Sequence, residues 1–493
     1  MRVLIFDLDT LRPDHLGCYG YHRNTSPNID KIASNGVRFD NYYTSDAPCL
    51  PSRAALVTGM PGIHSGAIGH NGTCADLRLE GESRGFISNF DAKGSLWRIF
   101  RKAGMRTCTI SPFAERHSAY WFLAGFNEVH NPAGKCGSES AEEITPTVME
   151  WLEKNGDDDN WMLHVNYWDS HTPYRAPAEF GNPFKEDPIP NWFSEEILAE
   201  HVKLAGPHTA RDNNMYNGQN NSNFPRQIND IKNMTDLRDC IDGYDCGIRY
   251  MDEHIGRVLD FLDKKGLMDD TAIIITSDHG ENFGELGIYS EHGTADNITC
   301  RIPMIIKWPG MMKGHIDEGL RYNFDLAPTL SEIFGTKPWD KWCGKSYAAA
   351  LKDGDDPGRN ELILSQNAHV CQRSVRWDNW LYIRTYHDGY HPHFESEMLF
   401  DIDKDPHETT NLAAEHPEII NDGASRLKIW LDEMLKTMPY GYSKDPMEIV
   451  LKEGGPFHAN KNLAPVTEYK QRLIDTGREH WLNQLAEKHP EFS

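Results

Sequence analysis

The sequence predicts an α/β fold in which a large mixed, mostly parallel β-sheet is sandwiched by helices, with a small C-terminal α+β subdomain after it. Two observations lead to this class. Apolar runs without polar alternation, typical of strands buried on both faces, recur along the first two thirds of the chain. After Lys352 the pattern changes to short strands and then helices. The long buried strands are predicted at Arg2–Leu8, Arg106–Ile110, Trp161–Tyr167 and Thr271–Thr276.

Helical patterns separate these strands. In the longest, Asp239–Lys264, apolar residues recur every three or four positions, which places one helix face on the core. Ser26 followed by Pro27 is typical of a helix start. The predicted helices cover residues 26–36, 95–103, 141–154, 239–264 and 323–334.

A Gly- and Asp-rich segment, Gly354–Gly358, indicates a linker between two units. It divides the chain into a large α/β domain over residues 1–352 and a C-terminal subdomain over residues 353–493. Short strand patterns follow the linker, and helices end the chain. The C-terminal strands are predicted at residues 362–364, 374–377, 380–385 and 398–400.

The composition is that of an ordinary globular protein. Its 493 residues are 39% hydrophobic and 25% charged, and a formal net charge of −24 argues against nucleic acid as a partner. No apolar run reaches the ~20 residues that span a bilayer, so we expect no membrane segment. The ten cysteines form no Cys-x-x-Cys pair, and Met1-Arg2 leads into a strand rather than a secretory signal. We therefore expect free thiols and a cytoplasmic protein.

The stretch from Ala47 to Gly59 carries the strongest chemical signal. Cys49 stands at the end of a loop, and the run after it, with Pro51 in its first turn, predicts a helix. A helix N-terminus presents free N–H donors and the positive end of the dipole, which suits an anion or a nucleophile that attacks one. Arg53, about one turn later, reaches the same point. The alternative is a structural cysteine at an ordinary loop-to-helix junction.

The string Cys49-Leu50-Pro51-Ser52-Arg53 resembles the signature of the type I sulfatases, a family of the alkaline phosphatase superfamily. The resemblance implies an alkaline phosphatase-like fold and hydrolysis of a sulfuric ester. It also implies that a maturase oxidises Cys49 to formylglycine, whose hydrate is the nucleophile and is held by Arg53.

Two polar segments at strand ends resemble the metal-binding segments of the same family. Asp9 follows the first strand and Asp278-His279 follow a later one, at the carboxyl edge where open α/β sheets bind ligands. Together with position 49 they imply a site for one divalent cation, for which Ca²⁺ is the first choice and Mg²⁺ and Mn²⁺ are alternatives. The family usually has two adjacent aspartates, whereas here Thr10 follows Asp9. Asp7, on the same strand face, is a further candidate ranked below Asp9.

Four histidines complete the predicted site. His171, in a His-x-Pro sequence, and His292 are candidates for contacting the sulfate and protonating the leaving group. His70 is a candidate polar contact after the signature helix. Many sulfatases hold the sulfate with a Gly-Lys-x-His motif, which is absent here, and Arg116 and His117 are the candidate substitutes. For each histidine, the alternative is a plain loop residue.

We expect the substrate to be a small sulfated saccharide carrying an O-sulfate or a sulfamate. The net charge of −24 repels polyanions, and the Asn-, Pro- and Gly-rich insertion at residues 177–233 can form one wall of a pocket. Two other functions stay open. One is a phosphonate monoester or phosphodiester hydrolase of the same superfamily, which the missing Gly-Lys-x-His motif favours. The other is a non-catalytic, metal-dependent sugar-binding protein in which Cys49 stays a thiol.

Overall fold

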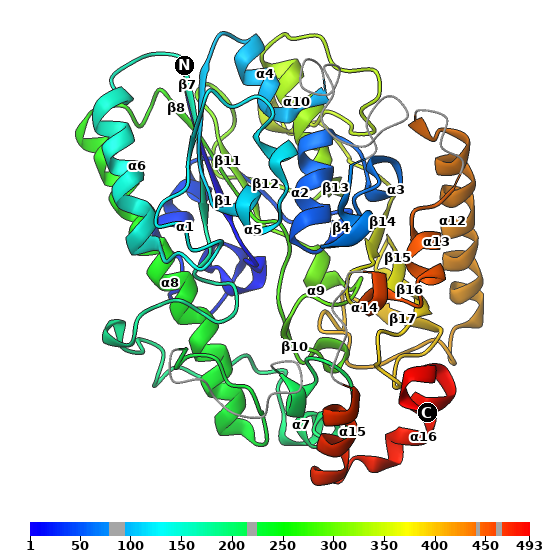
Figure 1. The fold of residues 1–493 in the computed structure, drawn as a ribbon. Helices are drawn as coiled ribbons and strands as arrows, with labels where there is room; N and C mark the ends of the chain where they lie inside the picture. The colour runs from blue at the N-terminus through cyan, green and yellow to red at the C-terminus, as the bar shows by residue number, and fades with distance from the viewer. Residues whose placement is uncertain (78–93, 214–223, 440–443, 460–465) are drawn as a thin grey trace.

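The computed structural model describes residues 1–77, 94–213, 224–439, 444–459 and 466–493. Its centre is an eight-stranded sheet in the order β12-β2-β11-β8-β1-β7-β5-β6 (Figure 1). The strands from β8 to β6 run parallel, whereas β11 is antiparallel to β8 and β2. The predicted mixed, mostly parallel sheet is therefore confirmed. In sheet order its strands are His315–Asp317, Val37–Phe39, Met304–Lys307, Thr271–Thr276, Arg2–Leu8, Trp161–Tyr167, Arg106–Ile110 and Glu128–His130.

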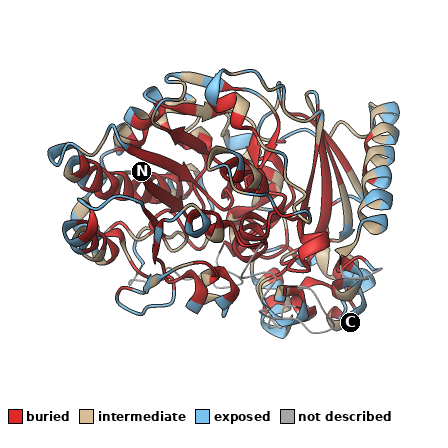
Figure 2. Ribbon diagram, turned by 90° about the horizontal axis from the view of Figure 1, so that it is seen from above, coloured by how far each residue is buried: buried red, intermediate tan, exposed pale blue. Residues whose placement is uncertain are grey.

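Helices cover both faces of this sheet (Figure 1). One face carries α1 (Pro27–Ser34), α6 (Ala141–Asn155) and α8 (Met234–Lys264), and the other carries α2 (Cys49–Thr58), α4 (Leu96–Lys102) and α10 (Leu326–Ile333). Between these layers β1, β7 and β8 are buried along their full length, as Figure 2 shows for the central strands. This double cover explains why their sequences are apolar without alternation.

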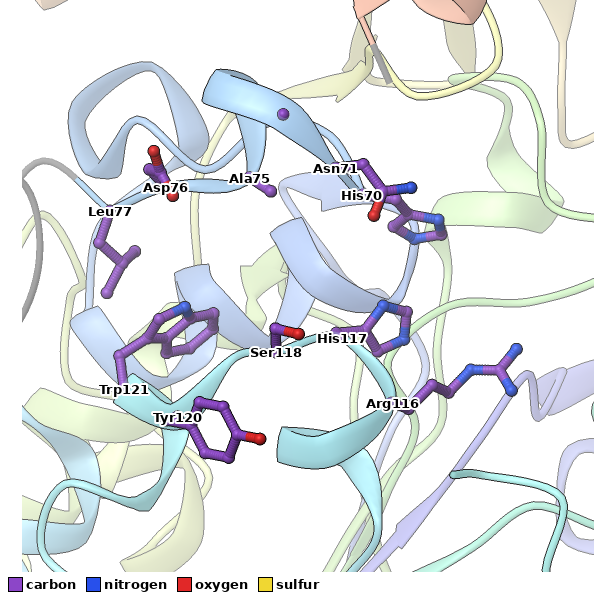
Figure 3. Close-up of a pocket in the computed structure, with 11 residues that line it drawn as sticks. His70, Asn71, Ala75, Asp76, Leu77, Arg116, His117, Ser118, Tyr120 and Trp121 are labelled. Atoms are coloured by element: carbon purple, nitrogen blue, oxygen red, sulfur yellow. The ribbon is translucent and has the colours of Figure 1, made fainter. Parts of the chain in front are cut away.

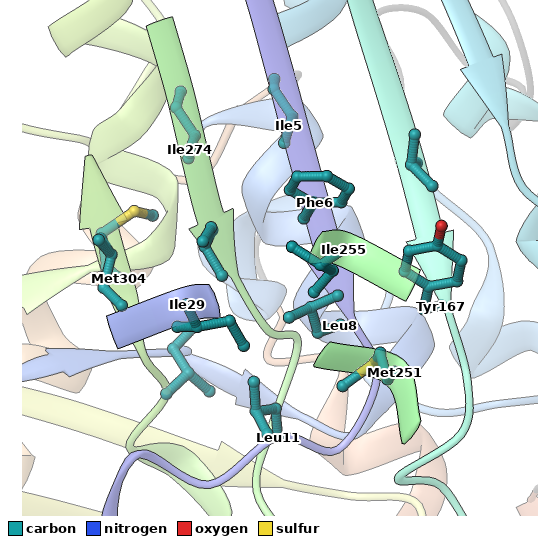
Figure 4. Packing of buried hydrophobic residues seen from close by; sticks show 14 of the residues in the cluster. Ile5, Phe6, Leu8, Leu11, Ile29, Tyr167, Met251, Ile255, Ile274 and Met304 are labelled. Carbon is teal, nitrogen blue, oxygen red and sulfur yellow. The ribbon is translucent and has the colours of Figure 1, made fainter. Parts of the chain in front are cut away.

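Strand β1 sends successive side chains to opposite faces of the sheet. Phe6 and Leu8 point toward α1 and α8, where they pack among Ile29, Met251 and Ile255 (Figure 4). The odd positions, which include the two aspartates at the end of the strand, point to the face that carries α2. The period of two therefore directs the carboxylates toward the helix that begins at the signature cysteine.

A second sheet follows the linker. Its order is β17-β16-β15-β14-β4, and β14 to β17 are antiparallel neighbours. The edge strand β4 (Asp46–Ala47) comes from the region just before Cys49 and pairs parallel with β14. The other strands are Glu361–Gln366, Cys371–Trp377, Trp380–His387 and Glu397–Asp401, close to their predicted positions. The division at residue 352 stays a prediction, since one strand of this sheet lies far upstream of it.

Helices end the chain. The long helix α12 (Pro417–Lys436) packs through Leu427 on the second sheet, in a cluster with Trp377 and Tyr382. The shorter helices after it are Met447–Lys452, Pro456–Ala459, Val466–Asp475 and Leu482–Lys488. None of the helices in the described ranges combines the length and the apolar character needed to cross a membrane. All ten cysteines lie in these ranges and are free thiols.

The longest helix begins earlier than predicted. The apolar stripe suggested a start at Asp239, but α8 begins at Met234 because Asn233 caps it by accepting hydrogen bonds from the backbone N–H groups of Thr235 and Asp236. Leu237, in the first turns of α8, is buried and continues the apolar stripe toward the N-terminus, so the stripe begins earlier than the prediction placed it.

Candidate active site and metal centre

Cys49 is the first residue of α2 and is 1% exposed. Strand β4 and Pro48 lead into it, and its Sγ atom lies 3.0 Å from Nε2 of His279. The whole of α2 is buried, so the start of this helix is fixed in the protein interior. The predicted helix with Pro51 in its first turn is confirmed.

The structure brings the four predicted metal ligands together. One ligand atom from each of Asp9, Cys49, Asp278 and His279 lies within 4.8 Å of the others, and all four residues are buried. The topology explains this meeting, because Asp9 follows β1 and Asp278-His279 follow β8, and these two strands are parallel neighbours. Their carboxyl ends reach the same edge of the sheet.

Arg53 lies among three carboxylates. Its Nε and Nη2 atoms donate to the two oxygens of Asp7 at 2.9 Å each, Nη2 lies 3.0 Å from Asp9 Oδ2, and Nη1 donates to Asp278. The guanidinium also sits 4.7 Å from the ring centre of Phe113. Both oxygens of Asp7 are thus used to hold Arg53, which explains why Asp7 is not among the clustered ligand atoms.

The charges around this cluster fit a bound cation. Burial, followed by the nearby Asp278, raises the pKa of Asp9 to about 7. Although burial favours neutral imidazole, Asp278 raises the pKa of His279 to about 10. Both oxygens of Asp9 and the hydroxyl of Thr10 are buried without a hydrogen-bond partner in the described parts of the chain. These groups therefore hold protons where a divalent cation would satisfy the same negative charge.

His292 is held between two carboxylates that the sequence analysis did not assign. Its Nδ1 lies 3.2 Å from Glu281 and its Nε2 lies 2.9 Å from Glu291, while its ring lies 3.9 Å from that of His279. Burial opposes the charged form, but Glu291 raises the pKa of His292 well above its ordinary value. The two glutamates therefore favour the charged imidazolium form of His292, in which a ring N–H is present for donation. The signal for both glutamates was their position beside motif residues, in His279-Gly280-Glu281 and Glu291-His292.

His171 has the opposite character. Its Nδ1 bonds to the carbonyl of Thr172, and its Nε2 lies 3.9 Å from Asp9 Oδ1. Burial, followed by the charge of Arg116, holds the pKa of His171 well below its ordinary value. A neutral ring that donates through Nδ1 presents a lone pair at Nε2. His171 is thus suited to accept a hydrogen bond or bind a cation, and His292 is the better proton donor.

His70 and His117 face each other at the inner end of a pocket of about 500 Å³ (Figure 3). Their ring centres lie 5.1 Å apart, and burial, followed by Arg116, lowers the pKa of His117 to about 3. His117 is therefore a neutral hydrogen-bonding group rather than a positive charge. His369 lies between this pocket and the predicted site residues around Cys49 and His292, which we call the catalytic cluster. The ring centre of His369 lies 6.2 Å from that of His70 and 6.0 Å from that of His292.

Arg116 supplies the positive charge at this end of the pocket. Its guanidinium lies 5.1 Å from the ring centre of Trp168, and the guanidinium of Arg53 lies 5.6 Å from the same ring. Its Nη1 donates to the carbonyl of Cys136 at 3.4 Å. No carboxylate among the described residues is within ion-pair distance of Arg116, so its charge is available to an anion.

Two further histidines surround Glu291 and were not predicted. His208 Nε2 lies 3.2 Å from Glu291 Oε2, and His369 Nε2 lies 3.9 Å from Oε1. His208 belongs to the insertion at residues 177–233, of which 214–223 lie outside the described residues. The insertion thus reaches the catalytic cluster through His208. None of its described residues lines the pocket of Figure 3.

The sequence model of the Sulfatase family matches residues 2–336, and that of the N-sulphoglucosamine sulphohydrolase C-terminal region matches residues 284–434. Among curated relatives, the multifunctional alkaline phosphatase superfamily protein PehA of Trinickia caryophylli is 26% identical over 486 residues, covering 82% of this chain and 89% of the relative. The arylsulfatase of Clostridium perfringens is 25% identical over 465 residues, covering 83% and 89%.

Solved structures share the fold. The phosphonate monoester hydrolase of Agrobacterium radiobacter superposes with a TM-score of 0.67 at 20% identity, covering 88% of this chain and 96% of its own. A protein solved with its substrate D-glucosamine-2-N,6-O-disulfate gives a TM-score of 0.68 at 19% identity, covering 91% and 99%. The matched family, the curated relatives and the predicted signature at Cys49 agree. The chain belongs to the sulfatase family of the alkaline phosphatase superfamily and is a sulfuric ester hydrolase.

Proposed function

We propose that this enzyme hydrolyses the sulfate ester or sulfamate of a small sulfated saccharide, with formylglycine at position 49 as the nucleophile. One observation carries the proposal. Asp9, Cys49, Asp278 and His279 are buried with their ligand atoms within 4.8 Å of one another, and both oxygens of Asp9 lack a hydrogen-bond partner in the described parts. A structural cysteine would not need two buried carboxylates and an imidazole gathered around it.

The nucleophile forms on the chain itself. A maturase, with an external two-electron oxidant, converts the CH₂–SH group of Cys49 to an aldehyde; the C–S bond breaks and the sulfur leaves as sulfide, and water then adds to the aldehyde to give a geminal diol. One hydroxyl attacks sulfur and the sugar oxygen leaves. The second hydroxyl then loses its proton and expels sulfate, which restores the aldehyde. Arg53, fixed by the two hydrogen bonds that it donates to Asp7, would lie beside the diol and balance its charge.

The cation site consists of Asp9, Asp278, His279 and the side chain at position 49, with the hydroxyl of Thr10 as a further oxygen donor. When bound, a divalent cation neutralises sulfate oxygens and lowers the pKa of a coordinated hydroxyl. The oxygen-rich donor set favours Ca²⁺ or Mg²⁺, and the imidazole of His279 also suits Mn²⁺.

The remaining groups have two roles: some bind the sulfate, and one protonates the sugar oxygen as it leaves. His292, kept protonated by Glu291, donates the proton that the departing oxygen needs. His171 and His117 are neutral and offer hydrogen-bonding atoms, and Arg116 contributes positive charge. Arg116 and His117 thus replace the missing Gly-Lys-x-His motif, with His70 beside them.

Three features support a small saccharide. The net charge of −24 disfavours approach of a polyanion, although salt screens this effect beyond a Debye length of ~8 Å. The pocket of about 500 Å³ suits a ligand of one or two rings. One structural neighbour was solved with a sulfated glucosamine as its substrate, and the Iduronate 2-sulfatase of Homo sapiens is 25% identical over 376 residues.

The test combines mass and activity. The protein is produced with a maturase, and the mass of the peptide containing residue 49 is measured with the divalent cation content. Hydrolysis of a sulfated disaccharide is compared with that of its parent polymer across ionic strengths. We expect an aldehyde at residue 49, one cation per chain and faster turnover of the disaccharide. A thiol at residue 49 in an active enzyme contradicts the nucleophile, and faster turnover of the polymer at low salt contradicts the substrate class.

A second candidate function is hydrolysis of phosphonate monoesters or phosphodiesters. The absence of the Gly-Lys-x-His motif favours it, because that motif holds sulfate in many sulfatases. Parallel rates on matched sulfate and phosphonate esters separate the two functions. A higher kcat/KM on the phosphonate ester would assign it as the main activity.

A further inference from the structure

The pocket beside the catalytic cluster continues outward past His117 to an aromatic wall. Tyr120 and Trp121 begin the short helix η5 (Tyr120–Leu123) and line the pocket together with Ser118 (Figure 3). His117 lines the same pocket, and burial, followed by the charges of Arg116 and Arg53, lowers its pKa. The pocket therefore has Arg116 and His117 on one side and the aromatic wall of Tyr120 and Trp121 on another.

The two aromatic residues of this wall have different surroundings. Trp121 is 8% exposed and makes edge contacts with Phe113 and Phe122, so it belongs to the core. Tyr120 is 58% exposed. Among the described residues its ring has no stacking partner and its hydroxyl has no hydrogen bond. Folding therefore does not explain why a large aromatic side chain occupies this position.

The polar atoms around Tyr120 indicate what kind of molecule fits. Ser118 contributes a hydroxyl, and Asn71 and Asp76 lie across the pocket (Figure 3). A flat aromatic surface beside hydroxyl, amide and carboxylate groups matches a pyranose ring, which has an apolar C–H face and a rim of hydroxyls. The polar lining therefore favours a ligand that carries hydroxyl groups over a purely apolar one.

Resting on the proposed function, we infer that the sugar ring bearing the sulfate binds in this pocket with its C–H face against the ring of Tyr120. The sulfate then points inward past His117 to Arg116 and the catalytic cluster. Tyr120 acts as a specificity residue for the saccharide and takes no part in the chemistry. A chain longer than one or two rings has to leave the pocket past Tyr120.

Binding to a catalytically silent protein tests this inference directly. In a Cys49→Ala background loaded with Ca²⁺, calorimetry measures the Kd of N-acetylglucosamine 6-sulfate and of inorganic sulfate. Loss of one aromatic contact is worth about 1.4 kcal/mol, or about tenfold in Kd. We therefore expect Tyr120→Ala to raise the Kd of the sugar sulfate about tenfold and to leave that of inorganic sulfate unchanged.

Two variants make the test specific. Tyr120→Phe keeps the ring and should bind the sugar sulfate within about twofold of the parent. Tyr386→Ala removes another exposed tyrosine, which is 41% exposed on β16 and does not line this pocket, and should change neither Kd. An unchanged sugar Kd in Tyr120→Ala, equal losses for both ligands, or an equal loss in Tyr120→Phe would each overturn the inference.

Failure of the inference and failure of the proposed function have different signatures. An enzyme that hydrolyses sugar sulfates but binds them independently of Tyr120 contradicts the inference alone. A protein that binds the sugar sulfate through Tyr120 but hydrolyses no sulfate ester, with an aldehyde at residue 49, contradicts the proposed function and supports the inference.

Discussion

Asp7 and Asp9 lie two residues apart at the end of β1, yet Asp7 holds Arg53 through two hydrogen bonds of 2.9 Å while neither oxygen of Asp9 has a hydrogen-bond partner in the described parts. The two carboxylates start from the same strand face, but Arg53 donates hydrogen bonds to both oxygens of Asp7 and makes only an ion-pair contact of 3.0 Å with Asp9 Oδ2. Asp9 is therefore available to bind a cation, whereas Asp7 fixes the position of Arg53.

This difference predicts separable effects of two isosteric changes. Asp9→Asn removes a charged ligand and should abolish stoichiometric binding of the divalent cation together with activity. Asp7→Asn should keep the cation but lower kcat/KM by about 10–100-fold, because Arg53 loses its anchor. Metal analysis after dialysis, with kinetics at saturating Ca²⁺, measures both. Loss of the cation in Asp7→Asn and its retention in Asp9→Asn would reverse the assignment.

The protonation states of His292 and His171 predict different dependence on the leaving group. His292→Gln should lower kcat/KM by about 10²–10³-fold on a sugar sulfate and much less on 4-nitrophenyl sulfate, whose phenolate leaves without a proton. His171→Gln should lower both rates equally, since a neutral acceptor does not protonate the leaving oxygen. Equal losses on both esters in His292→Gln would remove it from the role of acid.

Cys49 provides the third prediction. Cys49→Ala should abolish turnover and leave the melting temperature near that of the parent, because alanine fits the buried start of α2 with the loss of one sulfur atom. Cys18→Ala, at another free but partly exposed cysteine, is the matched control and should keep full activity. Activity of the Cys49 variant above a few per cent of wild type would disprove a covalent role for residue 49.

A buried ion-pair network gives a prediction on stability. Glu285 accepts hydrogen bonds from Arg12 at 3.0 Å and from His407 at 2.9 Å. Burial alone would raise the pKa of Glu285, but Arg12 and then His407 lower it from 4.5 to about 2. A depressed folded-state pKa stabilises the protein above pH 4.5, and this stabilisation is lost as the pH falls toward 2.

Glu285→Gln should therefore lower the free energy of unfolding by about 3 kcal/mol at pH 7. The difference from wild type should shrink as the pH falls below 4.5, since wild-type Glu285 then takes up a proton in the unfolded state. Melting temperatures of both proteins at pH 7 and pH 3.5 measure this. Glu200→Gln, at an exposed glutamate on α7 (Glu195–His201), is the control and should track wild type. A gap that stays constant with pH would refute the electrostatic origin.

The strand ends that form the candidate metal site could be predicted from the sequence. Asp9 and Asp278 each follow an apolar run, and such runs are visible because strands covered on both faces cannot alternate with polar residues. Cys49 was visible through the chemistry of its neighbours Pro51 and Arg53. These features are local, so periodicity and motif spacing are enough to find them.

The residues around Glu291 could not be predicted from the sequence, because they come from segments that are far apart in the chain. His208 comes from an insertion and has a left-handed φ of 59°, and His369 sits in the turn between β14 and β15. They meet Glu291 only because three distant segments fold against one another. Nothing local distinguishes such histidines from ordinary loop residues. The double hydrogen bond from Arg53 to Asp7 was hidden in the same way, because it forms between a helix and a strand.

The pairing of β4 with β14 limits when the proposed modification of Cys49 could take place. In the folded protein Cys49 is 1% exposed, and Asp46 and Ala47 just before it are paired with Ser365 and Gln366. A maturase must therefore act before this pairing forms. Residue 49 is synthesised about 310 residues ahead of β14, and at about 5–20 residues per second this leaves ~15–60 s. Under the proposed mechanism the interval closes when the second sheet takes up its fifth strand, and slower translation would then raise the fraction of chains that are converted.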